Sequence, residues 1–209
     1  MVGTDKKRAL VLIADGTEEM EAVITIDVLV RAGIEVTVAS ANPSESTTES
    51  VKCSRGVRIM PDTHLSALPI PTPSDSDKAY FYDVLMIPGG GPGAKTLAAS
   101  DTVHKFVQAH FSQPDVLLAA VCAGPIVIKA SGVARGAQVT SHPSVKDELK
   151  DYFEYQDDVK GDAIVVKDET MNILTSRGPG STFELALRIV QELYGKEAME
   201  AVRAPMMFP

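Results

Sequence analysis

The sequence predicts an α/β fold, in which a mainly parallel sheet is covered by helices on both faces. Short apolar, β-branched segments alternate with longer amphipathic ones along the 209 residues, an order typical of doubly wound sheets. Hydrophobic residues make up 44% of the chain, enough for a substantial core. No internal repeat or linker divides the chain, so we expect a single domain over residues 1–209.

The first half of the chain supplies three expected strands and two expected helices. The strands are 8–14, 35–40 and 83–88, and the helices are 18–33 and 96–111. Met20, Val23 and Val28 recur at helical spacing in the first helix, and Gly33 suits its end. Residues 41–50 and 67–79 are rich in turn-forming residues, so we expect surface loops there.

The second half continues the alternation to the end of the chain. We expect strands at 116–122 and 137–142, a hairpin at 163–176, and helices at 124–131, 144–153 and 181–202. Ligands of such folds bind where the carboxyl ends of the strands meet. The residues that follow each strand are therefore the candidates for function.

Charge and composition argue against several classes of protein. The net charge is −8 without a dense run of lysine or arginine, so we expect no nucleic-acid partner. No segment approaches the ~18 apolar residues of a membrane span, and the run "ALVLIA" is too short for a secretory signal. Two cysteines make no disulfide scaffold. We expect a cytoplasmic protein with reduced thiols and no membrane partner; the nucleus and mitochondrion are further locations.

An acidic segment, "DGTEEMEA", follows the first strand. Thr17 is the expected N-cap, and Glu18 and Glu19 then lie in the first helical turn, where the helix dipole favours them. Glu21 lies further into the helix. On the helical pattern alone it is solvated, but if it faces the sheet it is a buried carboxyl that needs a partner.

A glycine-rich loop, "PGGGPGAKT", follows the strand at 83–88. It nearly matches both a P-loop and a dinucleotide fingerprint. Pro92 removes one of the N–H donors that a phosphate would need. We therefore favour N–H groups that face a developing oxyanion, and nucleotide binding is the weaker alternative.

Cys122 and His142 each follow a strand. In "AAVCAGP" the small residues allow a tight strand-to-helix elbow. The positive end of the next helix would lower the pKa of Cys122, although a buried structural cysteine fits equally well. His142 could move protons or be a turn residue. The other three histidines lack ligand neighbours at metal-binding spacing, so we expect no metal.

Several segments taken together resemble one known family. The segments are "RALVLIADGTEEMEAVITIDVLVRAGIEVTVA", "CSRGV", "DVLMIPGGGPGA", "AAVCAGP", "SHP" and "LTSRGPGSTFELAL". In order and spacing they resemble the DJ-1/PfpI superfamily, in its Parkinson-disease-protein (protein deglycase) subgroup, from about residue 8 to about residue 205. The resemblance implies a flavodoxin-like α/β sandwich and a homodimer.

The resemblance also implies roles for individual residues. Cys122 would be the reactive cysteine on a nucleophile elbow, Glu21 its protonated partner, and His142 a histidine near the pocket. The oxyanion and substrate-binding side would be formed by Gly90, Gly91 and Ala123. The residues implied at the pocket mouth or the dimer seam are Arg31, Arg55, Arg177 and Pro179.

The implied activity is cysteine-dependent detoxification of reactive dicarbonyls. Methylglyoxal would become lactate without glutathione, cofactor or metal, and early protein glycation adducts are further candidate substrates. The alternative is a non-catalytic sensor and chaperone for oxidative stress, in which Cys122 is oxidised to a sulfinate. The chain departs from relatives at Ala123, where the protease branch has histidine, and at Met60, where some relatives have a second reactive cysteine.

Overall fold

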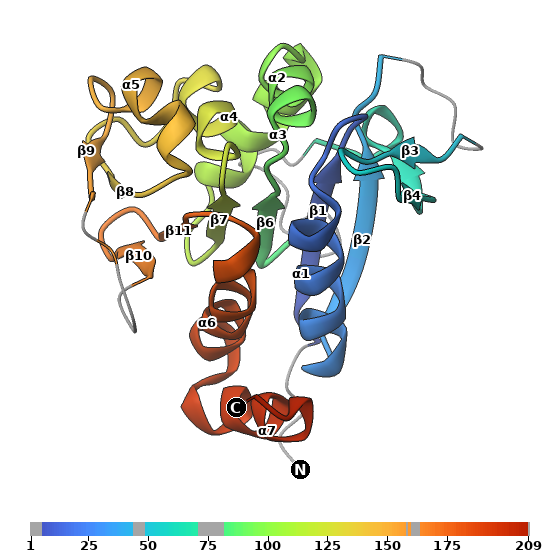
Figure 1. Ribbon diagram of the computed structural model, residues 1–209, viewed down its shortest axis with the longest axis vertical. Coiled ribbons are helices and arrows are strands. Elements are labelled where there is room, and N and C mark those ends of the chain that lie inside the picture. Colours follow the sequence, from blue (N-terminus) through green and yellow to red (C-terminus); the bar gives the residue numbers. More distant parts are fainter. Residues whose placement is uncertain (1–5, 44–48, 71–81, 158, 160–163, 209) are drawn as a thin grey trace.

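A computed structural model describes residues 6–43, 49–70, 82–157, 159 and 164–208. The strands of its main sheet are β1 (Arg8–Ile13), β2 (Glu35–Ser40), β5 (Thr63–His64), β6 (Val84–Ile87), β7 (Leu117–Val121), β10 (Val165–Asp168) and β11 (Ile173–Ser176). They lie in the order β10-β11-β7-β6-β1-β2-β5 (Figure 1). Every neighbouring pair is parallel except β10–β11. The mainly parallel α/β fold and the expected hairpin are confirmed.

Helices cover both faces of this sheet. One face carries α1 (Glu19–Arg31), α6 (Thr182–Tyr194) and α7 (Lys196–Arg203), and the other carries α2 (Gly91–Ala98), α3 (Asp101–Phe111) and α4 (Pro125–Ala130). Strand β1 shows why its sequence reads as continuously apolar. Leu10 and Leu12 pack into one core, while Val11 and Ile13 pack into the other. Figure 1 shows α1 and α6 side by side.

Two of the expected helices are each divided into two. The expected helix at 96–111 is wrong in its bounds: α2 already begins at Gly91, and Ser100 starts a new helix by accepting a hydrogen bond from the Val103 N–H at 3.4 Å. The expected helix at 181–202 breaks at Gly195, whose φ of 89° ends α6 and precedes α7. In both cases a single capping residue redirects an otherwise continuous helical pattern.

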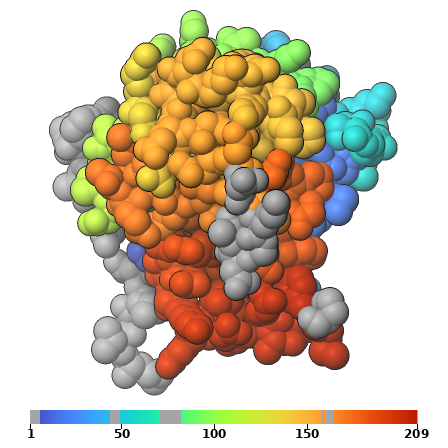
Figure 2. Space-filling model, turned by 60° about the vertical axis from the view of Figure 1, so that its left-hand side comes forward, coloured from blue at the N-terminus to red at the C-terminus, as the bar shows by residue number. Residues whose placement is uncertain are grey.

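The segment between α4 and β10 differs most from the expected structure. The expected strand at 137–142 is reduced to β8 (Gln138–Val139), which pairs with β9 (Glu154–Tyr155) outside the main sheet. The expected helix at 144–153 is a 3₁₀ turn, η3 (Pro143–Val145), followed by α5 (Lys146–Leu149). In Figure 2 this yellow-to-orange segment lies above the red C-terminal helices. The other 3₁₀ turns among the described residues are η1 (Leu65–Ala67), η5 (Pro179–Ser181) and η6 (Ala204–Met206).

A short hairpin follows the first expected loop. Its strands are β3 (Val51–Lys52) and β4 (Arg58–Ile59), which the sequence pattern did not predict. The Glu19 carboxylate accepts the Arg55 N–H at 2.8 Å and the Ser54 hydroxyl at 2.8 Å, and so ties the hairpin turn to α1. Much of both expected loops, 44–48 and 71–79, lies outside the described residues. None of the helices within the described ranges is long and apolar enough to cross a membrane.

Candidate active site

The carboxyl ends of three adjacent strands bring the candidate residues together. Strand β6 lies between β1 and β7 in the sheet. Helix α1 with Glu21 follows β1, the glycine loop follows β6, and Cys122 follows β7. Since parallel strands end at the same edge, the acid, the loop and the thiol meet at one point.

Cys122 occupies a strained elbow. Its φ is +60°, a conformation that a residue with a side chain seldom adopts. The Cys122 N–H donates to the Ser176 carbonyl at 3.0 Å, and its own carbonyl accepts the His142 N–H at 2.9 Å. These two bonds hold the backbone in place and leave the half-buried thiol at the end of the strand.

Glu21 is fully buried beside this thiol. Its Oε2 accepts the Gly89 N–H at 2.6 Å, while no group in the described part of the chain is a hydrogen-bond partner of Oε1. Burial, together with the negative charge of Glu18, raises the pKa of Glu21 from its usual value of 4.5 to about 7. A carboxyl that keeps its proton near neutral pH can donate a hydrogen bond, and the free Oε1 suits that role.

The glycine loop provides N–H groups for the thiol. Gly90 has a φ of +86°, and a Cβ added there would lie 2.2 Å from the Gly16 carbonyl oxygen, so only glycine fits. The N–H groups of Gly90 and Ala123 donate to the Cys122 thiol. Gly91 begins α2 and is exposed. Two N–H groups therefore lie at the thiol, as the expected oxyanion hole would require.

The expected cause of thiol activation needs correction. The sequence suggested that the next helix lowers the pKa of Cys122, but burial and the Glu21 carboxylate raise it to about 12. Helix α4 has only 6 residues, so its dipole is weak. When Glu21 is protonated its charge disappears, and the Gly90 and Ala123 N–H groups then act on the thiolate without that opposition. Activation of Cys122 therefore depends on the proton of Glu21.

His142 is joined to the site by its backbone N–H, which donates to the Cys122 carbonyl, and its side chain is exposed. Its Nδ1 accepts the Ser144 N–H at 3.2 Å and lies 2.8 Å from the Ser144 hydroxyl. In the neutral ring the proton is therefore on Nε2. His142 can donate a hydrogen bond through Nε2, while Nδ1 is already occupied by Ser144.

The four residues implied at the pocket mouth or dimer seam are spread over the fold. Arg177 and Pro179 follow Ser176, next to the elbow. Arg55 lies in the β3–β4 turn, and Arg31 pairs with Asp27 at 2.6 Å near the end of α1. Ten residues of helix separate Arg31 from Glu21, about 15 Å, so Arg31 does not line the site. Its place in a dimer seam stays a prediction.

Sequence reasoning missed the residue that caps α1. Glu18, and not Thr17, is the N-cap, and its Oε2 accepts the Glu21 N–H at 2.9 Å. Thr17 instead accepts the Ala14 N–H through its hydroxyl. Glutamate is not a preferred capping residue, so its residue type did not indicate the cap. The sequence indicated it only through the spacing, because an N-cap side chain accepts the N–H of the residue three positions later, here Glu21.

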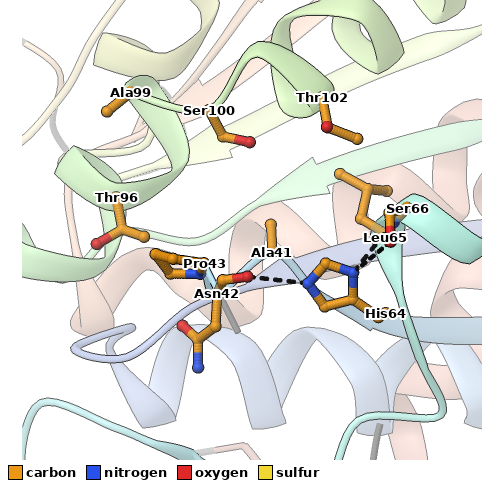
Figure 3. Close-up of a pocket in the computed structure, with 10 residues that line it drawn as sticks. All are labelled: Ala41, Asn42, Pro43, His64, Leu65, Ser66, Thr96, Ala99, Ser100 and Thr102. Atoms are coloured by element: carbon orange, nitrogen blue, oxygen red, sulfur yellow. Dashed lines mark hydrogen bonds between the residues drawn. The ribbon is translucent and has the colours of Figure 1, made fainter. Parts of the chain in front are cut away.

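A cavity of about 430 Å³ lies between the ends of β2 and β5 and helices α2 and α3 (Figure 3). Its lining includes none of Cys122, Glu21 and His142. His64, which lines it, uses Nε2 on the Asn42 carbonyl and Nδ1 on Ser66. Ser100 already caps α3. Because these polar groups have partners within the protein, we do not assign the cavity a ligand.

The second cysteine, Cys53, and the buried His110 are structural. Burial raises the pKa of Cys53 to about 11, and burial lowers the pKa of His110 to about 4. His110 is therefore neutral, with Nε2 on the Leu117 carbonyl at 3.0 Å. The described residues contain no group of three His, Cys, Asp or Glu side chains able to hold a metal ion.

The raised pKa of Glu21 predicts a pH-dependent stability. Between about pH 4.5 and pH 7 the folded protein keeps a proton that the unfolded chain releases, so stability falls as pH rises through this range. Glu21→Gln lacks this proton. Its free energy of unfolding relative to wild type should therefore rise by roughly 3 kcal/mol between pH 4 and pH 8. Urea unfolding at both pH values measures the difference, and a constant difference would contradict the raised pKa.

Comparisons with known proteins show the family of this chain and agree with its fold. Residues 7–192 match the DJ-1/PfpI family. The chain is 44% identical over 203 residues to the Parkinson disease protein 7 homolog of Danio rerio, covering 96% of this chain and 97% of that protein. It is 36% identical to the glutathione-independent glyoxalase DJR-1.2 of Caenorhabditis elegans, covering 96% of each. The crystal structure of Drosophila melanogaster DJ-1beta superposes with a TM-score of 0.85 at 41% identity, covering 98% of this chain and 100% of that one.

Proposed function

The chain belongs to the DJ-1/PfpI family, and we propose that it converts methylglyoxal to lactate in the cytoplasm without glutathione. The observation that carries the proposal is the meeting of Cys122 with the Glu21 carboxyl and the Gly90 and Ala123 N–H groups. The relative from Caenorhabditis elegans, named a glutathione-independent glyoxalase, supports it. The same thiol chemistry extends to early glycation adducts of proteins.

The first step is attack of the Cys122 thiolate on the aldehyde carbon. The carbonyl π electrons move to oxygen, which takes the proton of the Glu21 carboxyl, so that a hemithioacetal and the Glu21 carboxylate form. The N–H groups of Gly90 and Ala123, which act on the Cys122 sulfur, would stabilise the developing negative charge on this oxygen. Their positions are fixed before the substrate arrives, because the loop and the elbow are held by backbone hydrogen bonds.

The second step moves hydrogen between the two substrate carbons. Glu21, once ionised, takes the proton from the former aldehyde carbon to give an enediol, and the neighbouring carbon is then protonated. The former aldehyde carbon is oxidised and its neighbour reduced, so no external oxidant is needed. The product is a lactoyl thioester on Cys122. His142, which carries its proton on Nε2, can donate to a substrate oxygen. Water then releases lactate and the thiol.

Lactate formation tests the proposal. The purified protein is incubated with methylglyoxal alone, and lactate is quantified by NMR in ²H₂O. Loss of methylglyoxal is not sufficient, because lysine and arginine side chains also consume it. We expect lactate with deuterium at the second carbon in proportion to enzyme concentration. If no lactate forms, the proposal fails, and oxidation of Cys122 to a sulfinate becomes the function to examine.

We also propose that the chain forms a homodimer through an apolar patch. Met20 and Val23 on α1 are 51% and 47% exposed, Val57 in the hairpin is 49% exposed, and Met60 directly after β4 is 60% exposed. The Glu19 carboxylate binds the hairpin turn and so holds these two elements together. Four exposed, large apolar side chains on two elements that are tied together favour a buried interface, and a second copy of the chain is the partner that the family resemblance implies.

A charge placed in the patch should separate the two copies. Val23→Glu is expected to sediment as a monomer at concentrations at which the wild type is a dimer, because a carboxylate would be buried without a partner. Ile70→Glu is the matched control, since Ile70 is also apolar and exposed but lies outside the patch. A Val23→Glu protein that remains dimeric would show that the interface lies elsewhere.

A further inference from the structure

A second buried carboxylate lies one helical turn before Glu21. Glu18 is 8% exposed, and none of the ion pairs among the described residues includes it. Burial of a charge without a cation is costly, and hydrogen bonds offset only part of that cost. The mechanism described above does not use Glu18.

A closed circuit of hydrogen bonds fixes Glu18 relative to Glu21. The Glu18 N–H donates to the Gly89 carbonyl at 3.0 Å, and the Gly89 N–H donates to Oε2 of Glu21 at 2.6 Å. The Glu21 N–H then donates to Oε2 of Glu18 at 2.9 Å. Each of the three residues is held by the next, so these bonds fix the Glu18 carboxyl on the first turn of α1 and the Glu21 carboxyl on the glycine loop. Two carboxylates held close together disfavour simultaneous ionisation.

The surroundings decide which of the two carries the proton. Glu18 is at the N-cap of α1, a helix of 13 residues, and the helix dipole favours a negative charge there. Glu21 is fully buried and has one oxygen without a partner. The groups that act on Glu21 are Glu18 from its own helix, the Gly89 N–H from the glycine loop, and Cys122 from the elbow. None of these is a cation, so Glu21 is the member that stays neutral.

We propose that Glu18 is a positioning residue, which keeps the proton on Glu21 and thereby sets the pH range in which Cys122 is reactive. The inference deepens the proposed function, because it concerns the acid of the same site. The negative charge of Glu18 is one of the causes of the raised pKa of Glu21. The helix cap and the charge are separate contributions of one side chain, and substitutions can distinguish them.

Glu18→Gln is the informative variant, because glutamine keeps an oxygen for the cap and loses only the charge. The pH midpoint of Glu21 ionisation, followed by NMR of protein labelled with ¹³C at the glutamate carboxyls, should fall by about one pH unit. The Glu21 signal is assigned by its loss in Glu21→Gln. Glu19→Gln is the matched control: it changes the next residue in the same way, and Glu19 is not among the groups acting on Glu21.

A second readout follows the thiol. If the midpoint falls from about 7 to about 6, the protonated fraction of Glu21 at pH 7 drops from about one half to about one tenth. The extra negative charge then opposes the thiolate, so alkylation of Cys122 by iodoacetamide at pH 7 should slow about fivefold in Glu18→Gln. The Glu19→Gln control should react at the wild-type rate.

An unchanged midpoint in folded Glu18→Gln overturns the inference. If that variant does not fold, Glu18→Ser replaces it, because serine is a preferred N-cap without a charge, and an unchanged Glu21 midpoint in that variant overturns the inference. These measurements do not use turnover. If the protein makes no lactate but the Glu21 midpoint falls in Glu18→Gln, the proposed activity is wrong and the role of Glu18 still holds.

Discussion

Replacing Cys122 by alanine should lower the rate of lactate formation from methylglyoxal at least about a thousandfold, because no other described group can form the covalent intermediate. The second cysteine cannot substitute for it. Cys53 is 4% exposed, and burial together with nearby carboxylates raises the pKa of its thiol to about 11. At neutral pH Cys53 is therefore protonated and out of contact with the substrate. The rate of lactate formation at saturating methylglyoxal measures the effect.

Cys53→Ala is the matched control for this experiment. It removes the same thiol group from the same chain, and we expect it to keep nearly all the wild-type activity. Thermal unfolding of both variants shows whether each is folded. If Cys122→Ala retained a tenth of the wild-type rate while folded, the thiol would not be the nucleophile. The Glu21 carboxyl would then have to act by general base catalysis alone.

The sheet could be predicted from sequence because its strands are buried on both faces. In β1 every residue from Ala9 to Ile13 is buried, so the strand reads as a continuous apolar run. The helix ends were harder to predict, since a single residue decides them. Ser100 and Gly195 each interrupt a pattern that remains helical on both sides. The short strands β3, β4 and β8 have only 2 residues each, too few to show a period.

The candidate site shows a different limit. Cys122, Glu21 and Gly90 could be named from sequence because each follows a strand and matches a family motif. The environment of Glu21 could not be predicted from sequence. The carboxyl binds the Gly89 N–H, and Gly89 lies 68 positions further along the chain. The predicted lowering of the Cys122 pKa was wrong for the same reason, because the pKa is raised. A local rule gave weight to the following helix, whereas the structure places a carboxyl beside the sulfur.

Two substitutions of Glu21 should separate its two roles. Glu21→Gln keeps a carbonyl oxygen for the Gly89 N–H and places an amide donor where Oε1 faces the site, but it cannot transfer a proton. Glu21→Ala removes both functions. We expect lactate formation to fall by about 10²–10⁴-fold in both variants, because each lacks the acid–base group. Alkylation of Cys122 at pH 7 should stay near the wild-type rate in Glu21→Gln and slow in Glu21→Ala.

The glutamine variant also separates catalysis from stability. Wild-type Glu21 is destabilising above pH 7, where its carboxylate is ionised and buried, and the amide removes that cost. The same substitution should therefore make the protein more stable at pH 8 and nearly inactive. A gain in stability together with a loss of activity is expected when a residue serves catalysis at the expense of the fold. If Glu21→Gln were both less stable at pH 8 and active, the carboxyl would be a structural group, and the acid of the reaction would have to be sought at Nε2 of His142.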